Sequence, residues 1–327
     1  LVTELVEQAR RGVKVTVLLE GGPVGGIDDQ ELWACQALHD TGHGVCAFMV
    51  NAPELDIHDR YSYLHAKVII VDRKRVLIGS QNLTHSGIPD DDKSNGTGGS
   101  RGVVLVTDAP EIVSRAAEVF EADYDPKNHA DIVAWGSGDI PGYGPPPSGF
   151  TPDQGQDWVS YSVQFSETVR AEGTGFELVT GPETTLRSDD SLLGLLARAG
   201  AGDAVLVEQM YETEQWGRDG APNPRLQAYV DAARRSARVR ILLNGGDLGV
   251  EYLSVAQNAE VVAYVNEIAE NERLDLGAGL GDPTRYGVHN KMVLADLGAE
   301  GRYAHVGSIN GSETSNKANR EMALQVR

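Results

Sequence analysis

The pattern of apolar and polar positions predicts helices and strands that alternate along the chain. Apolar residues spaced three and four apart predict amphipathic helices at the start of 1–15, over 108–124 and over 184–200. Continuous apolar runs within 64–72 and 203–212 predict buried strands. This alternation is typical of an α/β protein.

The same order of elements occurs twice. The second set follows the first by 224 positions up to a motif strand and by 219 positions at a later strand. The matched segments are QARRGVKVTVLLEGG (8–22) with AARRSARVRILLNGG (232–246), LHAKVIIVD (64–72) with VHNKMVLAD (288–296), and SRGVVLVT (100–107) with NREMALQV (319–326). A repeat of this length that occurs twice predicts two copies of one α/β domain rather than a solenoid.

Proline and glycine indicate where the two copies are joined. The segment PGYGPPPSGFTPDQGQD (141–157) interrupts any regular element and is typical of a linker or an exposed loop between domains. We therefore expect a first domain over 1–128, a linker over 129–159 and a second domain over 160–327.

The ends of the repeat do not match. The first copy has no counterpart of the helix and strand predicted over 184–212, and the second has none of the helix over 108–124. The chain also begins without methionine. We expect both ends to be trimmed, so the sequence does not predict the compartment, and both a membrane-associated and an extracytoplasmic location stay open.

Charge and hydropathy narrow the classes of partner. The 327 residues carry a net charge of −20, and arginine is used far more often than lysine. This usage is typical of a protein that stays hydrated in high salt, and a generally acidic surface is the alternative. Either way, the charge disfavours indiscriminate nucleic-acid binding. No apolar run approaches the roughly 18–20 residues that a membrane helix needs.

Neither the two cysteines nor the glycine-rich segment near the second motif indicates a functional site. Cys35 and Cys46 are too few for a metal framework. They could pair, and two buried free thiols are the favoured alternative. The segment GAGLGD (277–282) precedes no strand–helix turn of the dinucleotide-binding type, so we interpret it as a flexible loop.

The motif strand carries the candidate chemistry. His65 and Lys67 are two residues apart, so on a strand both side chains point to the same face. Asp72 falls on the opposite face and opens a turn, which makes it an orienting or turn-forming residue rather than a proton carrier. The same holds for His289, Lys291 and Asp296. A single such pair is more often a surface or core-edge feature.

Two copies of the motif favour a phosphate site. If two domains related by a pseudo-two-fold axis bring both motifs together, two imidazoles can act as nucleophile or base and as acid. Two ammonium groups supply positive charge for a phosphate. Asn82 and Asn310 can donate to its oxygens. No carboxylate cluster that would hold Mg²⁺ adjoins either motif, so we predict neither a metal nor a cofactor.

The two motifs resemble the signature of the phospholipase D superfamily, which is His-x-Lys-x(4)-Asp followed by Gly-Ser-x-Asn. The matching residues are His65, Lys67, Asp72, Ser80 and Asn82 in the first copy, and His289, Lys291, Asp296, Ser308 and Asn310 in the second. The resemblance implies two pseudo-two-fold-related α/β domains, each a mixed sheet flanked by helices. It also implies metal-independent cleavage or transfer at a phosphodiester through a phosphohistidine.

The resemblance also assigns roles and leaves alternatives. Members of the family often carry an acid that braces a histidine, and Glu321 fits in the second copy, whereas the first copy has Gly102 at that position. We predict His65 as the nucleophile, His289 as the acid and a Glu321–His289 contact. A phospholipid substrate with peripheral membrane contact is favoured over a nuclease, and a non-catalytic binding scaffold is the third alternative.

Overall fold

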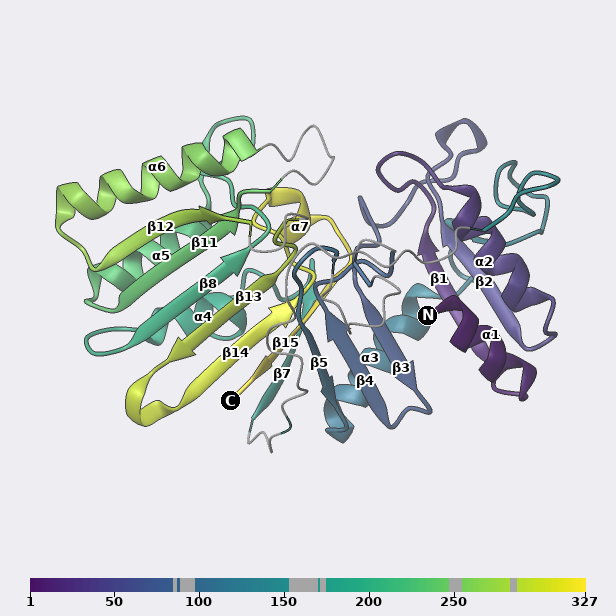
Figure 1. The fold of residues 1–327 in the computed structure, drawn as a ribbon, viewed down its shortest axis with the longest axis horizontal. Helices are drawn as coiled ribbons and strands as arrows, with labels where there is room; N and C mark the ends of the chain where they lie inside the picture. The colour runs from purple at the N-terminus through teal and green to yellow at the C-terminus, as the bar shows by residue number, and fades with distance from the viewer. Residues whose placement is uncertain (85–86, 89–97, 153–169, 171–174, 247–254, 283–286) are drawn as a thin grey trace. The chain divides into compact units, whose positions relative to one another are not determined.

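The computed structural model describes residues 1–84, 87–88, 98–152, 170, 175–246, 255–282 and 287–327 (Figure 1). The chain forms two compact units. The N-terminal unit comprises Leu1–His65 and Ala117–Gln154, and the C-terminal unit comprises Ala66–Ala116 and Gly155–Arg327. The chain therefore passes from one unit to the other inside the first motif. The division into domains at 1–128, 129–159 and 160–327 stays a prediction.

The N-terminal unit is a small sheet with helices. Its strand order is β1-β2-β6, with β1 and β2 parallel and β2 and β6 antiparallel. Apolar side chains of both helices pack in one core with Phe48 of β2. The elements are α1 (Val2–Arg10), β1 (Val15–Glu20), α2 (Asp29–His39), β2 (Gly44–Met49), the 3-10 helix η1 (Pro53–Leu55) and β6 (Ile132–Ala134).

The two cysteines form a disulfide in this core. Cys35 lies on α2 and Cys46 on β2, and the structure joins them. The favoured interpretation as free thiols was therefore wrong. The sequence placed one cysteine on a helix and the other on the next strand, but only their packing in the same core brings the Cα atoms to 5.6 Å.

The described part of the Pro/Gly-rich segment packs on the same unit. Tyr143 donates from its hydroxyl to the carbonyl of Gly21 at 2.9 Å, and its ring lies against Phe48. Trp135 donates from its indole nitrogen to the carbonyl of Gly144 at 3.0 Å. The start of this segment thus covers the N-terminal core, and 153–157 lie outside the described residues.

A seven-stranded mixed sheet forms most of the C-terminal unit, in the order β12-β11-β8-β13-β14-β15-β7. Strands β12, β11 and β8 are parallel, and the remaining neighbours are antiparallel. The strands are β7 (Phe176–Gly181), β8 (Ala204–Gln209), β11 (Arg238–Asn244), β12 (Leu276–Gly281), β13 (Lys291–Asp296), β14 (Arg302–Gly307) and β15 (Glu321–Val326).

Helices cover one face of this sheet because alternate strand residues are apolar. Val205 and Val207 of β8 and Val293 of β13 point into a core with apolar side chains of the helices. Leu206 and Leu294, which are paired neighbours on the other face, are partly exposed. The helices are α4 (Ser191–Arg198), α5 (Pro224–Arg234) and α6 (Val255–Glu272), and α6 runs along β12 and β11 (Figure 1).

A three-stranded antiparallel sheet carries the first motif. Its strands are β3 (Val68–Val71), β4 (Arg75–Gly79) and β5 (Val104–Thr107). Gly79 pairs with Val104 as Gly307 pairs with Ala323 in the second copy. Val104 and Ala323 are 219 positions apart, the offset seen in the sequence, whereas their partners Gly79 and Gly307 are 228 positions apart.

The two copies differ in how their strands are joined. In the second copy, β8 lies between β11 and β13 and joins the parallel to the antiparallel part of the sheet. The described first copy has no counterpart of β8, and β1 and β3 belong to separate sheets. The mixed sheet is therefore continuous only in the second copy.

The glycine-rich segment is a strand rather than a flexible loop. Residues Leu276–Gly281 form β12, which pairs in parallel with β11. A Cβ at Gly281 would lie 2.8 Å from a methyl group of Leu242, so glycine permits the close approach of this strand. Glycine weakens a strand on its own, and pairing with β11 decides the outcome here.

The remaining elements are short, apart from α3. They are α3 (Pro110–Asp123), β9 (Gln215–Trp216), β10 (Ala221–Pro222), the 3-10 helix η2 (Gly298–Glu300) and α7 (Glu313–Lys317). Among the described residues, no helix combines the length and apolar character that a membrane crossing requires.

Candidate active site

The motif residues of the second copy gather at one edge of the seven-stranded sheet. Lys291 begins β13, Ser308 and Asn310 follow the end of β14, and Glu321 begins β15. Because these strands are antiparallel neighbours, the start of β13, the end of β14 and the start of β15 lie at the same edge. The side chains of all four are buried.

The first motif begins before its strand. The sequence predicted His65 and Lys67 on a strand, but β3 begins at Val68. The reason is that Lys67 accepts from Gly79 through its carbonyl at 3.1 Å, whereas the backbone of Ala66 turns to donate to the carbonyl of Arg320 at 2.9 Å. The first motif is thus tied to the second copy at the edge where Glu321 begins β15.

Two buried lysines and one carboxylate dominate the charge of this edge. Burial lowers the pKa of Lys67 to about 7, and the charge of Glu321 acts against this shift. Burial also lowers the pKa of Lys291 well below its ordinary value, the charge of Lys67 lowers it further, and Glu321 again opposes. One carboxylate cannot balance two ammonium groups, so an oxyanion bound here would favour both cations.

His289 is held between the copies. Its Nδ1 lies 2.7 Å from the carbonyl oxygen of Ser80, and its backbone N–H donates to the carbonyl of Arg101 at 2.7 Å. The ring nitrogens lie 3.0 and 3.4 Å from Nζ of Lys291, which donates to the carbonyl of His289 at 2.9 Å. In the second copy, the side chains of His289 and Lys291 therefore lie next to each other, as predicted.

Two neighbours of Nδ1 act on the tautomer of His289 in opposite directions. An ammonium group at Lys291, 3.0 Å from Nδ1, favours this nitrogen as an acceptor. The carbonyl of Ser80 can only accept, so it favours a proton on Nδ1 and leaves Nε2 as the acceptor. The sequence did not predict this contact, since the acceptor is a main-chain atom of the other copy; the predicted contact between Glu321 and His289 stays a prediction.

The two serines of the signature brace the strands. Ser80 accepts through Oγ from the backbone N–H of Val103 at 2.9 Å, and its own N–H donates to the carbonyl of Val103 at 3.0 Å. Ser308 makes the equivalent pair with Met322, at 3.1 and 2.9 Å. Both serines are fully buried. Their hydroxyl groups thus continue the hydrogen bonds between neighbouring strands beyond the ends of β4 and β14.

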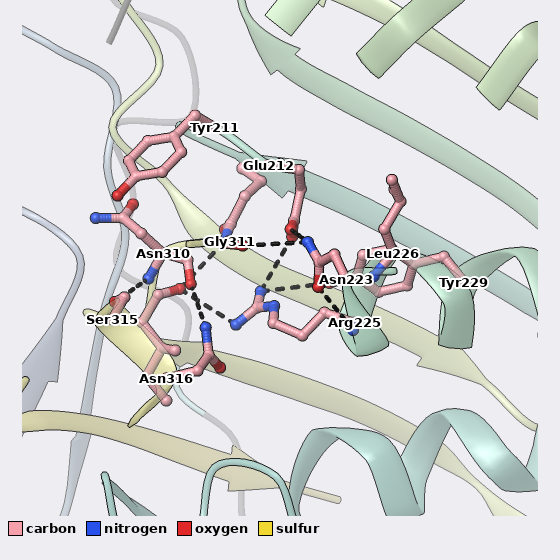
Figure 2. Close-up of polar contacts among 12 residues, drawn as sticks. Tyr211, Glu212, Asn223, Arg225, Leu226, Tyr229, Asn310, Gly311, Ser315 and Asn316 are labelled. Atoms are coloured by element: carbon pink, nitrogen blue, oxygen red, sulfur yellow. Dashed lines mark hydrogen bonds and ion pairs between the residues drawn. The ribbon is translucent and has the colours of Figure 1, made fainter. Parts of the chain in front are cut away.

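A buried network holds Asn310 (Figure 2). Its N–H donates to Oγ of Ser315 at 2.8 Å, and its carbonyl accepts from Nδ2 of Asn316 at 2.8 Å. Ser315 in turn donates to Oε1 of Glu321 at 2.5 Å. Oδ1 of Asn310 is buried and makes no hydrogen bond within the described part of the chain. Asn82, its counterpart, is exposed.

The residues on either side of Asn310 are fixed by a second buried cluster (Figure 2). The carbonyl of Ile309 accepts from Gln209 at 3.1 Å, and the carbonyl of Gly311 accepts from Asn223 at 3.1 Å and from the indole of Trp216 at 3.0 Å. The sequence did not predict these residues, since no local pattern connects positions about 90 apart.

An ion pair lies at the centre of this cluster. Nη2 of Arg225 lies 3.3 Å from Oε1 of Glu212, and both side chains are almost fully buried. Burial raises the pKa of Glu212, while the positive charge of Arg225 and a hydrogen bond from Asn223 act against this. Asn223 also caps α5, accepting from the N–H of Arg225 at 2.9 Å. The Asn-Pro step at 223–224 was the one local sequence pattern that indicated a part of this cluster, the start of α5.

The missing glutamate of the first copy has a structural counterpart. A Cβ at Gly102 would overlap the side chain of Gln81. Gln81 donates through Nε2 to the carbonyl of Ser100 at 2.8 Å. An amide thus fills the space beside Gly102, and Glu321 is left as the carboxylate that acts on both lysines.

Both motif aspartates lie away from the lysines. Asp72 and Arg73 form the β3–β4 turn, each with φ of 51°. Asp296 ends β13, where it accepts from the N–H of Gly298 at 3.2 Å and from Nε of Arg302 at 3.0 Å. Five residues of strand separate Asp296 from Lys291, which is roughly 17 Å. Their position supports the turn-forming interpretation and places them beyond reach of a phosphate at the lysines.

His65 is the last residue of the N-terminal unit. Within the described ranges, no three histidine, cysteine, aspartate or glutamate side chains form a group that could hold a metal ion.

Comparison with known proteins identifies the fold. Residues 1–124 match the model described as "Cardiolipin synthase, PLD-like domain". Phosphatidylserine synthase from Haemophilus influenzae is 11% identical, with a TM-score of 0.61 over 99% of this chain and 72% of that one. Residues 1–124 are thus phospholipase D-like in sequence, and the structural match extends the likeness in fold to the whole chain. The predicted resemblance and α/β fold class are thus confirmed.

Other phospholipase D-like structures resemble parts or all of the chain at lower TM-scores. NucT from Helicobacter pylori is 17% identical, with a TM-score of 0.33 over 46% of this chain and 84% of that one. Yeast tyrosyl-DNA phosphodiesterase is 12% identical, with a TM-score of 0.46 over 95% and 76%. A search among curated proteins found no match.

Proposed function

We propose that this phospholipase D-like chain is a metal-independent phosphodiesterase or phosphatidyltransferase that works through a phosphohistidine. One observation carries the proposal. Two buried motif lysines, one from each copy, share a single carboxylate, and the charge of Lys67 lowers the pKa of Lys291, which lies beside His289. Such an excess of positive charge away from water suits the non-bridging oxygens of a phosphodiester.

The proposed reaction has two displacements at phosphorus. Nε2 of His65 attacks, a P–N bond forms, and the P–O bond to the leaving alcohol breaks while His289 gives that oxygen a proton. Water or a second alcohol then attacks, the P–N bond breaks, and His289 takes the proton back. Hydrolysis and transfer differ only in the acceptor.

The remaining residues serve charge and geometry. Lys67 and Lys291 neutralise the oxygens, and Asn82 and Asn310 donate to them. The rigid surroundings of Asn310 suit this role, because a donor fixed before the reaction costs no reorganisation. The carbonyl of Ser80 favours the Nδ1–H form of His289, and Nε2 is then the nitrogen that exchanges a proton with the leaving oxygen.

A phospholipid is the favoured substrate, with peripheral contact to a membrane. The net charge of −20 opposes a polyanion. The one basic run, Arg73-Lys74-Arg75, lies at the turn of the β3–β4 hairpin. Lys67 precedes the opposite end of β3, roughly 15–20 Å away. This run is badly placed as a track for nucleic acid leading to the lysines. A nuclease is the alternative.

A substrate panel tests the proposal. Phospholipids with different head-groups, single-stranded DNA and RNA are each incubated with the protein, with and without EDTA. We expect release of the head-group alcohol, unchanged by EDTA. Cleavage of nucleic acid alone would select the nuclease, and activity restored only by a divalent ion would contradict the two-histidine mechanism. Absence of any cleavage would favour the binding scaffold.

Trapping separates the two histidines. With a diester whose leaving group needs no protonation, His289→Ala should accumulate phosphorylated protein and His65→Ala should not. The label is located by peptide mapping. A label on His289 in the His65→Ala variant would reverse the assignment.

A further inference from the structure

Glu20, the last residue of β1, holds the backbone just before the first motif by two hydrogen bonds, an arrangement that we call the grip. Its Oε2 accepts from the N–H of Leu64 at 2.5 Å, and its Oε1 accepts from the N–H of Gly22 at 2.7 Å. Leu64 immediately precedes His65. All of these residues belong to the N-terminal unit, so the grip does not depend on the C-terminal unit.

Asn244 does the same in the second copy. It is the last residue of β11, and its Oδ1 accepts from the N–H of Val288 at 2.7 Å and from the N–H of Gly246 at 3.0 Å. Val288 immediately precedes His289. Acceptor, glycine and pre-histidine residue each lie 224 positions after their counterparts in the first copy.

The histidines need such a grip because neither lies within a strand. Strand β3 begins three residues after His65, and β13 begins two residues after His289. Both histidines thus lie outside the ladders of β3 and β13, although the N–H of His289 also donates to the carbonyl of Arg101. An acceptor at the end of β1 or of β11 fixes the N–H before each histidine and ties it to the glycine turn.

The two acceptors differ in charge, but each binds the N–H of the residue before the histidine and the N–H of a glycine. A carboxylate uses one oxygen for each N–H, whereas the amide uses one oxygen for both and donates from Nδ2 to the carbonyl of Gly246 at 2.7 Å. Burial raises the pKa of Glu20, the hydrogen bonds from the N–H groups of Leu64 and Gly22 act against this shift, and the nearby charge of Asp59 adds to it. Negative charge is thus costly here, and hydrogen-bond acceptance is the shared property.

We infer that Glu20 and Asn244 are positioning residues that set the backbone from which His65 and His289 reach the phosphate. The inference rests on the proposed function, since it concerns the placement of the two histidines. Such a residue acts on the reaction step more than on binding, because a misplacement of about 1 Å can cost ~100-fold in rate.

Paired variants test this with bis(p-nitrophenyl) phosphate as the probe. Glu20→Met and Asn244→Leu remove the acceptor at similar size, and we expect each to lower kcat about 100-fold with KM within about threefold. Glu20→Gln keeps an acceptor, as in the second copy, and should retain kcat. Glu31→Met is the matched control, because Glu31 is another partly buried carboxylate of this unit and caps α2 by accepting from Asp28.

Hydrogen exchange of the Leu64 and Val288 amides provides a readout independent of turnover. Exchange should quicken at Leu64 in Glu20→Met, at Val288 in Asn244→Leu, and at neither in Glu20→Gln. If the parent protein does not cleave the diester, the proposed function fails while exchange still tests the grip. Equal kcat in Glu20→Met and the parent, or equal losses in Glu20→Gln and Glu20→Met, would overturn the inference. Should Glu20→Met not fold, Asn244→Leu and Glu20→Gln decide.

Discussion

At the scale of single residues, burial lowers the pKa of both motif lysines of the candidate site. Both are buried, and the shift of Lys67 brings its pKa to about 7. A lysine with this pKa gains or loses its charge within the neutral range. Arginine at the same position would stay charged throughout, since its pKa lies above about 12.

We predict that anion binding weakens as pH rises through neutrality. The protonated form of Lys67 attracts an anion, and this form is lost as pH rises above about 7. Sulfate, which keeps its charge over this range, should bind several-fold more weakly at pH 8.5 than at pH 6 in calorimetric titrations. Lys67→Arg should flatten the dependence, and Lys74→Arg, on the exposed turn, should leave it unchanged. A parent protein with no pH dependence would contradict the shift.

At the scale of elements, the residues of the candidate site lie at the ends of strands, and buried clusters hold these ends. The loop after β14 is held from β8, α5 and α7, so its asparagine has little freedom. The Arg225–Glu212 pair is the charged centre of this support. Breaking a buried pair leaves an uncompensated charge, which costs more than the pair itself contributes.

We predict that Arg225→Met lowers the free energy of unfolding by about 3–5 kcal/mol, because Glu212 would stay buried without its partner. Urea unfolding measures this. Arg234→Met is the control, since Arg234 lies on the same helix and pairs with Asp231 and Glu272 at the surface. Exposed pairs contribute about 0–1 kcal/mol. Similar losses in the two variants would contradict the buried role of Arg225.

At the scale of the whole molecule, charge sets the response to salt. A net charge of −20 disfavours any compact state through self-repulsion. Salt shortens the range of this repulsion from about 10 Å at 0.1 M to about 3 Å at 1 M. The acidic composition therefore suits concentrated salt, whatever its origin.

We predict that molar KCl raises the urea midpoint of unfolding and leaves phosphodiester turnover intact. KCl is chosen because it screens charge with little salting-out. A variant with several exposed acidic residues changed to neutral ones should respond less, which separates screening from general salt effects. Turnover that peaks at low ionic strength and collapses in molar salt would contradict the interpretation of the composition.

Much of the fold and of the candidate site could be predicted from the sequence alone. The duplicated His-x-Lys-x(4)-Asp motif identified the fold family, because side-chain chemistry at fixed spacing is a local property. The repeat anticipated matching elements in the two copies, and the polar run that begins at Asp72 indicated the turn between two strands. These inferences needed no knowledge of which segments pack together.

Only the tertiary structure decided the rest, since each remaining feature joins positions far apart. The glycine-rich 276–281 became a strand by pairing with β11, and Cys35 met Cys46 inside a shared core. The carbonyl of Ser80 reached His289 across 209 positions. Main-chain acceptors and buried ion pairs leave no local pattern, because what selects them is the need to satisfy polar groups that packing has removed from water.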